Sequence, residues 1–464
     1  MAKTFLDNLH TILCYKLNCN VDLDKLTEAA NKMLDRHLIL KSVFFEGKFD
    51  GVKTAFGRVK ENMTIKIEEY TKDNFEEFVR PFDITKDKLL RIGIIEKSIL
   101  IIDMNHIITD GFSMNLFATE LFKLYNGETL ENQAVQYGDF AIHYNNRLKT
   151  ADFSNEIIYY KKLFGKTNDL TCLPYKSKFK NDIKFILKSK AYQMYKISKM
   201  MILKTKPDIK IINVDLSNSV YNLINKSAKR FNLSKAAYFL AIHSLVLACY
   251  SKQEDIYTIV IDSNRMTLER ENIIGLLLRE IPFLINVNNN AKLLDLLRKC
   301  SETLLTLYDF NLPPYKILDE LKLQKSGVAF KYDPYEMINS KNEKIYNGIE
   351  LSDVYKYFHK PCPKSEELDF GPYMEYVFTV NEMKDIYKLG FLYDGDLFDE
   401  KLIKNIVNMY IDIISNESLL QSNISDLFDK YSVSDDKISA SNNIKKNKIN
   451  KNNKEEILNI KIEI

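Results

Sequence analysis

A histidine that follows an apolar run marks the segment of this chain best suited to chemistry. The segment reads Asn105-His106-Ile107-Ile108-Thr109-Asp110-Gly111. It follows the apolar residues 99–102, typical of a buried strand, and precedes a stretch with helical spacing that begins at Ser113. Neutral imidazole is the side chain best suited to accept a proton near pH 7, so His106 is a candidate general base.

Asp110 and Gly111 extend this hypothesis across the turn that follows His106. Asp110 could hold His106 directly or fix the loop through an arginine, and the spacing leaves both arrangements open. Gly111 suits a close backbone approach or a positive φ. The amides of a helix capped by Ser113 would favour negative charge. A base and an oxyanion site without a metal or a cysteine nucleophile suit acyl transfer to an amine or hydroxyl. The alternative is a packed histidine without a catalytic role.

The composition is that of a large globular protein. The 464 residues, 45% of them hydrophobic, can form the cores of two or three domains. The 66 Lys and Arg nearly balance 63 Asp and Glu, which argues against nucleic acid or an anionic membrane as a partner. No apolar run reaches the roughly 18 residues of a membrane helix. The six Cys lack zinc spacing, and no secretory signal is seen, so we expect reduced thiols, no metal and a cytoplasmic location.

Strands and helices recur in two halves of similar size. The sequence predicts strands over residues 9–17, 43–45, 89–95, 98–104, 209–214, 255–261, 281–287, 378–380 and 389–393. It predicts helices over residues 21–38, 113–126, 217–231, 234–249, 293–308 and 398–414. We therefore expect an α/β fold, an α+β sandwich, with domains at 1–172 and 173–431. Residues 432–464 are too polar to bury a face and predict a disordered tail, with a docking or linker role as the alternative.

The other histidines carry weaker signals. A structural role is favoured for His37 at a helix end and for His143 on a helix. His243 lies in an apolar helix and is predicted to be a hydrogen-bonded core residue. His10 and His359 have no partner visible in the sequence.

Around the segment from Asn105 to Gly111, the chain resembles the condensation domains of nonribosomal peptide synthetases, members of the HHxxxDG acyltransferase superfamily. Met104–Ser113 resembles the motif MHHxxSDGxS. Other segments match further family motifs in the same order: Asp35–Phe44 (RHExLRTxF), Tyr137–Ala141 (YxDFA), Asn264-Arg265 (the end of GQEDIxxGxxxxxR), Ile273–Gly275 (the start of IGxFVNT) and Tyr393–Phe398 (YDxxLF). This ordered series covers residues 9–427 and is more specific than any single motif.

The resemblance implies two chloramphenicol-acetyltransferase-like halves in a V-shaped pseudo-dimer with a central tunnel. It implies a condensation-type acyltransferase that forms an amide in nonribosomal peptide biosynthesis. The acyl or peptidyl donor would be a thioester on the phosphopantetheine arm of a carrier protein, and the acceptor would be a small amine or alcohol. The chemistry would need no cofactor, and the protein would be a monomer.

The resemblance also implies roles for individual residues. His106 would deprotonate or orient the nucleophile, and Gly111 would lie near the reacting carbonyl. Asp110 would be structural, with Arg265 as its partner. Asn105 replaces the first histidine of the motif, and its amide can still donate and accept hydrogen bonds in support of the site.

Three departures from the family pattern define the alternatives. Arg279 and Glu280 stand where the family has small or polar residues, which puts acceptor-side or carrier contacts in doubt. The family's opening segment SxAQxRxW is absent, and no carrier-attachment or adenylation motif follows, so we expect a free-standing or shortened member. The substrates would then come from other proteins or from CoA. One alternative is an O-acyltransferase that uses acyl-CoA or an acyl carrier and an alcohol. The other, suggested by Asn105 and by the altered Arg279-Glu280 region, is a catalytically degenerate condensation-like domain that recruits a partner.

Overall fold

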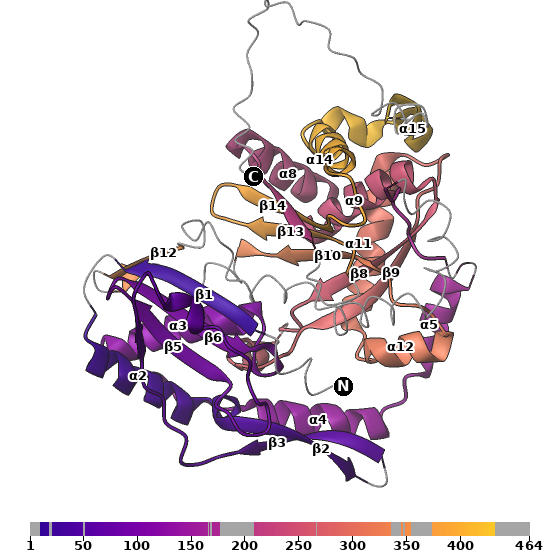
Figure 1. Cartoon of the computed structure of the whole chain (residues 1–464). Helices are drawn as coiled ribbons and strands as arrows, with labels where there is room; N and C mark the ends of the chain where they lie inside the picture. The colour runs from indigo at the N-terminus through magenta and orange to yellow at the C-terminus, as the bar shows by residue number, and fades with distance from the viewer. Residues whose placement is uncertain are drawn as a thin grey trace, which may run out of the picture. The chain divides into compact units, whose positions relative to one another are not determined.

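The computed structural model describes residues 10–17, 21–49, 52–165, 167, 169–176, 208–265, 267–335, 345–346, 349–353 and 374–431. The chain divides into two compact units, whose elements are drawn in Figure 1. Unit 1 comprises Met1–Ala151, Ser263–Leu278 and Tyr335–Gly371, and unit 2 comprises Asp152–Asp262, Arg279–Pro334 and Pro372–Ile464. The domain boundary at residue 172 stays a prediction, and the expected tail, 432–464, lies outside the described residues.

Unit 1 contains a six-stranded mixed sheet in the order β11-β12-β1-β6-β5-β4 and a separate hairpin, β2-β3. The strands are β1 (His10–Leu17), β2 (Ser42–Phe49), β3 (Val52–Val59), β4 (Glu68–Tyr70), β5 (Leu90–Ile95), β6 (Ile99–Asn105), β11 (Ile345–Tyr346) and β12 (Ile349–Asp353). The helices are α2 (Leu23–Arg36), α3 (Gly111–Tyr125), α4 (Tyr137–Thr150) and α10 (Leu268–Glu271), with short 3-10 turns η1 (Leu38–Lys41), η2 (Phe75–Glu77) and η3 (His106–Ile108). β12 comes from late in the sequence and pairs antiparallel with β1, the indigo strand of Figure 1.

Strands β5 and β6 form the predicted hairpin, which leads into the candidate site. Both turn residues, Glu96 and Lys97, have left-handed φ values of 48° and 53°. A two-residue turn needs this conformation to match the twist of the strands that it joins. β6 lies between β1 and β5 and is buried from Leu100 to Asn105, so its predicted central position is confirmed.

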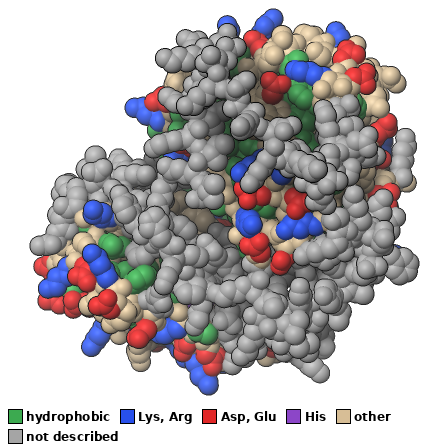
Figure 2. All heavy atoms as spheres, turned by 45° about the horizontal axis from the view of Figure 1, so that its top comes forward, with side chains coloured by type: hydrophobic (Ala, Val, Ile, Leu, Met, Phe, Trp, Pro, Cys, Tyr) green, Lys and Arg blue, Asp and Glu red, His purple; other side chains and the backbone are tan. Residues whose placement is uncertain are grey.

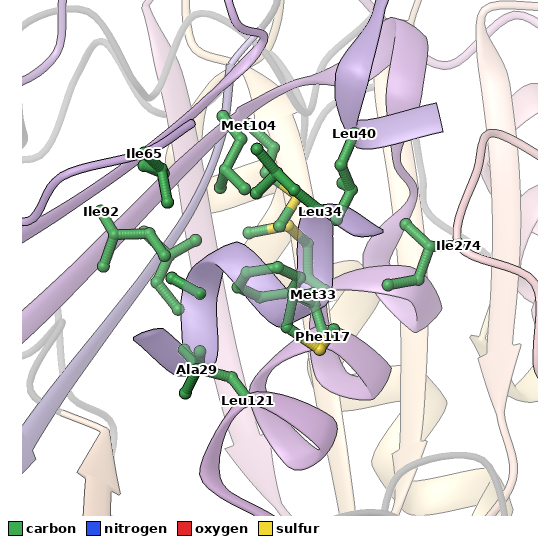
Figure 3. Close-up of a cluster of buried hydrophobic side chains, with 14 of the residues drawn as sticks. Ala29, Met33, Leu34, Leu40, Ile65, Ile92, Met104, Phe117, Leu121 and Ile274 are labelled. Atoms are coloured by element: carbon green, nitrogen blue, oxygen red, sulfur yellow. The ribbon is translucent and has the colours of Figure 1, made fainter. Parts of the chain in front are cut away.

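Helices α2 and α3 pack against the sheet and fill the core of unit 1, part of which is shown in Figure 3. Met33 of α2 and Phe117 of α3 meet Met104 of β6 in one buried cluster. Ile274 joins this cluster from the segment Ser263–Leu278, which follows a strand of unit 2 in the sequence. A piece of the chain from beyond residue 260 is therefore part of the core that supports the turn between β6 and α3. This turn, residues 105–111, is called the corner below.

The ends of these two helices follow the predicted signals. The Asp22 carboxylate accepts hydrogen bonds from the amides of Asp24 and Lys25, so the predicted cap of α2 is confirmed. Helix α3 ends at Tyr125, Asn126 is its C-cap, and Gly127 follows with φ of 84°. Glycine adopts this left-handed conformation without a Cβ penalty, and the predicted stop is confirmed.

Unit 2 contains a second six-stranded sheet in the order β7-β14-β13-β10-β8-β9. The strands are β7 (Ile209–Asp215), β8 (Asp255–Asp262), β9 (Arg279–Asn286), β10 (Val328–Asp333), β13 (Tyr376–Glu382) and β14 (Tyr387–Asp394). The helices are α5 (Ser154–Phe164), α8 (Asn218–Phe231), α9 (Lys235–Ser251), α11 (Leu293–Asp309), α12 (Pro314–Leu321), α14 (Glu400–Ile414) and α15 (Ile424–Tyr431), with the turn η6 (Glu417–Gln421). The predicted late hairpin is confirmed as β13–β14, and the predicted helices of this half appear as α8, α9, α11 and α14.

Helix α9 is the most apolar helix of the described chain regions and is buried along nearly its whole length. No described helix is by itself long and apolar enough to cross a membrane. Only α8 and α9 taken together, with a bend of 103° between them, reach the length and composition of a span.

The described surface carries charges of both signs. On the face drawn in Figure 2, the basic and acidic side chains that are coloured lie interspersed. The four cysteines in the described regions, Cys14, Cys172, Cys249 and Cys300, are not joined in disulfide bonds.

His243 of α9 is fully buried in an aromatic cluster. Its ring stacks on Phe378 at 4.9 Å and on Tyr376 at 5.6 Å, measured between ring centroids. Both ring nitrogens lack a hydrogen-bond partner within the described part of the chain, so the prediction of a hydrogen-bonded core histidine is wrong on that point. Its ring also packs against that of Phe330, with 6.3 Å between ring centroids. Burial lowers the pKa of His243 to about 3.

We predict that His243 makes the protein less stable in mild acid. The unfolded chain takes up a proton at this histidine below pH 6.5, whereas the folded chain does so only near pH 3. The free energy of unfolding should therefore fall as pH drops below 6.5, by up to about 1.4 kcal/mol per pH unit from this group. Urea denaturation of His243→Phe at several pH values should show a shallower dependence than the wild type. His143→Ala, which alters an exposed histidine of α4, is the control, and equal slopes for wild type and His243→Phe would contradict the prediction.

Candidate active site

Asn105 ends the buried strand β6 and begins the turn that carries His106. Its side chain is completely buried. The side-chain oxygen accepts a hydrogen bond from the amide of Ile107 at 3.0 Å, and the backbone amide donates to the carbonyl of Leu89 at 2.9 Å. Asn105 is thus the cap of the 3-10 turn η3, and this cap sets where His106 leaves the sheet.

His106 is the first residue of η3 and is partly exposed. Its carbonyl accepts a hydrogen bond from the amide of Thr109 at 3.4 Å, which closes the turn. Among the described residues, none forms a hydrogen bond with the imidazole ring. The ring nitrogens therefore remain available, as far as the described structure extends, to a substrate or to solvent.

Asp110 caps helix α3, and the sequence-based assignment of this cap to Ser113 is wrong. The helix begins at Gly111, and the Asp110 carboxylate accepts hydrogen bonds from the amide and the hydroxyl of Ser113, both at 2.8 Å. Aspartate and serine are about equally good caps, and only the backbone conformation decides between two candidates three residues apart. Gly111 is consequently the first helical residue, and it is exposed.

Asp110 and Arg265 form a buried ion pair at the base of the corner. One guanidinium nitrogen of Arg265 lies 3.0 and 3.1 Å from the two carboxylate oxygens of Asp110. The other donates to the carbonyls of Arg270 and Ile273 at 2.8 and 2.7 Å. The guanidinium also lies over the ring of Phe112, 4.4 Å from its centroid. Burial lowers the pKa of Arg265, and the charge of Asp110 opposes this shift.

The partners of Asp110 leave it no capacity to hold His106. Its second oxygen accepts from the amide of Leu277 at 3.1 Å, in addition to Arg265, while the first serves Ser113 and Arg265. Of the two arrangements that the spacing left open, the structure shows the arginine partner. His106 and Asp110 therefore do not share a contact, although they are only four positions apart in the sequence.

Gly275 places the segment Ser263–Leu278 against α3 and α4. Its amide donates to the hydroxyl of Ser113 at 3.1 Å, and its carbonyl oxygen lies 2.9 Å from the oxygen of that hydroxyl. A Cβ at this position would clash with the ring carbons of Tyr137. Tyr137 in turn donates its hydroxyl to the carbonyl of Leu276 at 3.3 Å. Burial, with a smaller contribution from Asp110, raises the pKa of Tyr137.

Arg279 and Glu280, which depart from the family pattern, are engaged within unit 2. Arg279 contacts Asp262 at 2.6 Å and donates to the carbonyls of Tyr308 and Phe310. Glu280 forms an ion pair with Lys325 at 2.6 Å. These two side chains therefore stabilise the start of β9 in this unit.

The remaining described histidines have structural surroundings. His37 is buried, and its ring lies 2.5 Å from the carboxylate of Glu120 on α3. His143 is exposed on α4. His10, for which the sequence showed no partner, contacts Asp103 of the neighbouring strand. His359 lies outside the described residues. No group of three or more His, Cys, Asp or Glu in the described regions is arranged to hold a metal ion.

Comparison with known protein families shows which family the chain belongs to. The family model described as Condensation domain matches residues 8–437. This chain belongs to the condensation domain family.

The curated relatives of this condensation domain are large synthetases. It is 23% identical over 410 residues to Gramicidin S synthase 2 of Brevibacillus brevis, covering 86% of the chain and 8% of that protein. It is 25% identical over 313 residues to Bacitracin synthase 3 of Bacillus licheniformis, covering 66% of the chain and 4% of that protein. The domain thus spans less than a tenth of the length of these two relatives.

Solved structures show the same fold. The condensation domain is similar to the X-domain from teicoplanin biosynthesis, with a TM-score of 0.70 and 15% identity over 92% of this chain and 95% of that one. It is similar to the condensation domain of the Monacolin K polyketide synthase MokA, with a TM-score of 0.68 and 14% identity over 88% and 92%. The expected chloramphenicol-acetyltransferase-like α/β fold is confirmed. The V-shaped arrangement and the tunnel stay predictions.

We predict that Asp110→Ala destabilises the condensation domain. The change leaves Arg265 as a buried charge without its counter-ion and removes the cap of α3, and the free energy of unfolding should fall by about 3–5 kcal/mol. Urea denaturation measures this loss. Glu28→Ala, which breaks an exposed pair with Lys32 on α2, is the control and should change stability little. If Asp110→Ala unfolded at the wild-type urea concentration, the ion pair would not have the assigned role.

We also predict that Gly275→Ala destabilises unit 1 through a clash with Tyr137. The added methyl group must displace the Tyr137 ring or the segment that carries residue 275, at a cost of about 1–3 kcal/mol. The double variant Tyr137→Ala/Gly275→Ala should lose less stability than the sum of the single variants, because the clash is absent. Strict additivity in this double-mutant cycle would rule out the contact as the cause.

Proposed function

We propose that this condensation domain forms an amide between an acyl or peptidyl group held as a carrier-protein thioester and the amine of an acceptor. The nitrogen of the amine attacks the thioester carbonyl, a C–N bond forms, and the C–S bond breaks. The proton lost by the amine is taken up at His106, and the leaving thiolate is protonated. The substrate classes follow from the family and from the names of the relatives, which are peptide synthetases.

The occupied carboxylate of Asp110 is the observation that carries this proposal. Because Asp110 is bound to Arg265 and Ser113, it cannot serve as a base or hold the imidazole. His106 is then the titratable group at the corner, and it is partly exposed. Gly111 begins α3 five positions further along the chain, and the positive end of the helix dipole would favour the oxyanion that develops on the carbonyl.

The proposed roles of the remaining residues follow from their contacts. Asn105 caps the turn that carries His106, so it orients the imidazole without touching the substrate. Asp110 and Arg265 hold α3 and the segment Ser263–Leu278 together. The carrier's phosphopantetheine arm would present the donor, and the chemistry needs no further cofactor. A monomeric state and a cytoplasmic location stay predictions.

We predict that His106→Ala loses most of the activity while the fold is retained. A positioned general base typically contributes about 10²–10⁴ in rate. The test incubates the domain with a panel of aminoacyl-loaded carrier proteins and free amines and follows amide products by mass spectrometry. His143→Ala, an exposed histidine of the same unit, is the matched control.

The outcomes separate amide formation from ester formation. Full activity of His106→Ala with an accepted substrate pair would contradict the assignment. Ester products from acyl-CoA and alcohols, with no amide from any carrier, would contradict the amide proposal in favour of an O-acyltransferase.

A second candidate function is recruitment of a protein partner by a domain without catalysis. Two observations favour it: Asn105 replaces a motif histidine, and the similar X-domain from teicoplanin biosynthesis has been solved in a complex with OxyB, with a TM-score of 0.65 to this chain. Partner binding that His106→Ala leaves unchanged, together with no product from any donor, would support this candidate.

A further inference from the structure

His10 lies at the start of β1, directly opposite Asn105 in the register of β1 and β6. Its Nδ1 lies 3.0 and 3.1 Å from the two carboxylate oxygens of Asp103. Arg91 of β5 donates to the same carboxylate at 3.1 Å. His10 is 3% exposed and Asp103 is 0% exposed, so an arginine, a carboxylate and an imidazole form a buried chain across three strands.

Arg91 is held firmly at the far end of this chain. Its guanidinium donates to the backbone carbonyls of Arg80 and Pro81 at 2.6 and 3.1 Å. It lies over the ring of Phe82, 3.7 Å from the centroid. Burial lowers the pKa of Arg91, and the charge of Asp103 opposes the shift. The charge of Arg91 therefore balances an ionised Asp103 inside the protein.

This pairing determines the tautomer of His10. An ionised carboxylate only accepts hydrogen bonds, so Nδ1 of His10 carries the proton and Nε2 holds a lone pair. The ring also packs on Phe82, with 5.1 Å between centroids. Nε2 is buried and has no hydrogen-bond partner among the residues that the structure describes. Unpaired buried polar atoms are rare, and each one calls for an explanation in strain, in catalysis or in an unseen ligand.

The position of His10 connects this chain to the candidate site. Directly opposite residues of an antiparallel pair point to the same face, with Cβ atoms about 4.5–5.5 Å apart. His10 therefore stands beside Asn105, the cap of the turn that carries His106. The imidazole that the motif lacks at position 105 is present one strand away, already oriented by Asp103.

We propose that His10 is a positioning residue for His106, with Arg91 and Asp103 holding its ring and Asn105 transmitting its position to the turn. The proposal rests on the proposed function insofar as His106 is the reacting group. The charged groups of the described structure that face His10 are Asp103 and Arg91, from β6 and β5. His10 supplies from β1 the imidazole that other members of the family carry within the motif itself.

The first test needs no substrate. The titration midpoint of the His106 ring is measured by NMR in the histidine-labelled full chain, with His106→Ala to assign the signal. The midpoint should move by at least about half a pH unit in His10→Asn and stay unchanged in Cys14→Ala. Cys14 is buried on β1, four residues after His10 and on the same face of the strand. Its substitution therefore reports the effect of a packing change alone. If His10→Asn does not fold, His10→Gln takes its place.

The second test uses turnover with an accepted substrate pair. In His10→Asn, kcat should fall roughly 10- to 100-fold with KM nearly unchanged, because misplacing the reacting group costs rate rather than binding. Asn105→His, which restores the motif histidine, should recover a large part of this loss in the double variant. If His10 had a merely structural role, His10→Asn would lower the melting temperature. It would then show neither a selective fall in kcat nor a recovery of activity in the double variant.

The outcomes of the two tests are distinguishable. A His106 midpoint that His10→Asn leaves unchanged in a folded protein overturns the positioning role, whether or not the domain has activity. A shifted midpoint in a protein that transfers no acyl group supports the coupling and instead contradicts the proposed function. A loss of activity that Asn105→His does not reduce also overturns the proposal.

Discussion

The buried ion pair between Asp110 and Arg265 is the interaction on which the candidate site depends. Asp110 caps α3 while its oxygens also bind Arg265 and the amide of Leu277. Removing a charged pair from water is unfavourable unless nearly every donor and acceptor finds a partner, and here nearly all of them do. The same contacts bring the segment Ser263–Leu278 against the start of α3. The geometry of the corner is therefore a consequence of satisfying one buried carboxylate.

This constraint also divides the chemistry between neighbouring residues. A carboxylate with all its acceptor positions occupied by an arginine, a hydroxyl and amides is an anchor rather than a base. His106 has no such partners in the described structure, and it is partly exposed. The corner thus combines a rigid support with a partly exposed imidazole. A second buried carboxylate, Asp103, is satisfied in the same manner by Arg91 and His10 on the sheet beside it.

Sequence reasoning predicted elements more readily than contacts. The β5–β6 hairpin and the cap at Asp22 follow from apolar patterning and from local side-chain signals, and both are present. The cap of α3 was misassigned because Asp110 and Ser113 are both good caps. The unpaired nitrogens of His243 could not be predicted either, since an apolar helix does not reveal whether a polar partner lies across the core. The pair of His10 with Asp103 spans 93 residues and depends on the register of two strands.

The sequence by itself determined the family, many of the strands and helices and the place of the His106 corner, because these depend on local patterns and on motifs in a colinear series. A resemblance named Arg265 as the partner of Asp110, whereas the residues alone left two arrangements open. Only the tertiary structure decided that Asp110 binds Arg265 and Ser113 together, that Ser263–Leu278 belongs to unit 1, and that His10 faces Asn105. The physical reason is that the contacts of Asp110 with Arg265 and of His10 with the strand of Asn105 join residues about a hundred positions apart or more. The pairing of the buried charge of Asp110 depends on a residue that no local stretch of sequence specifies.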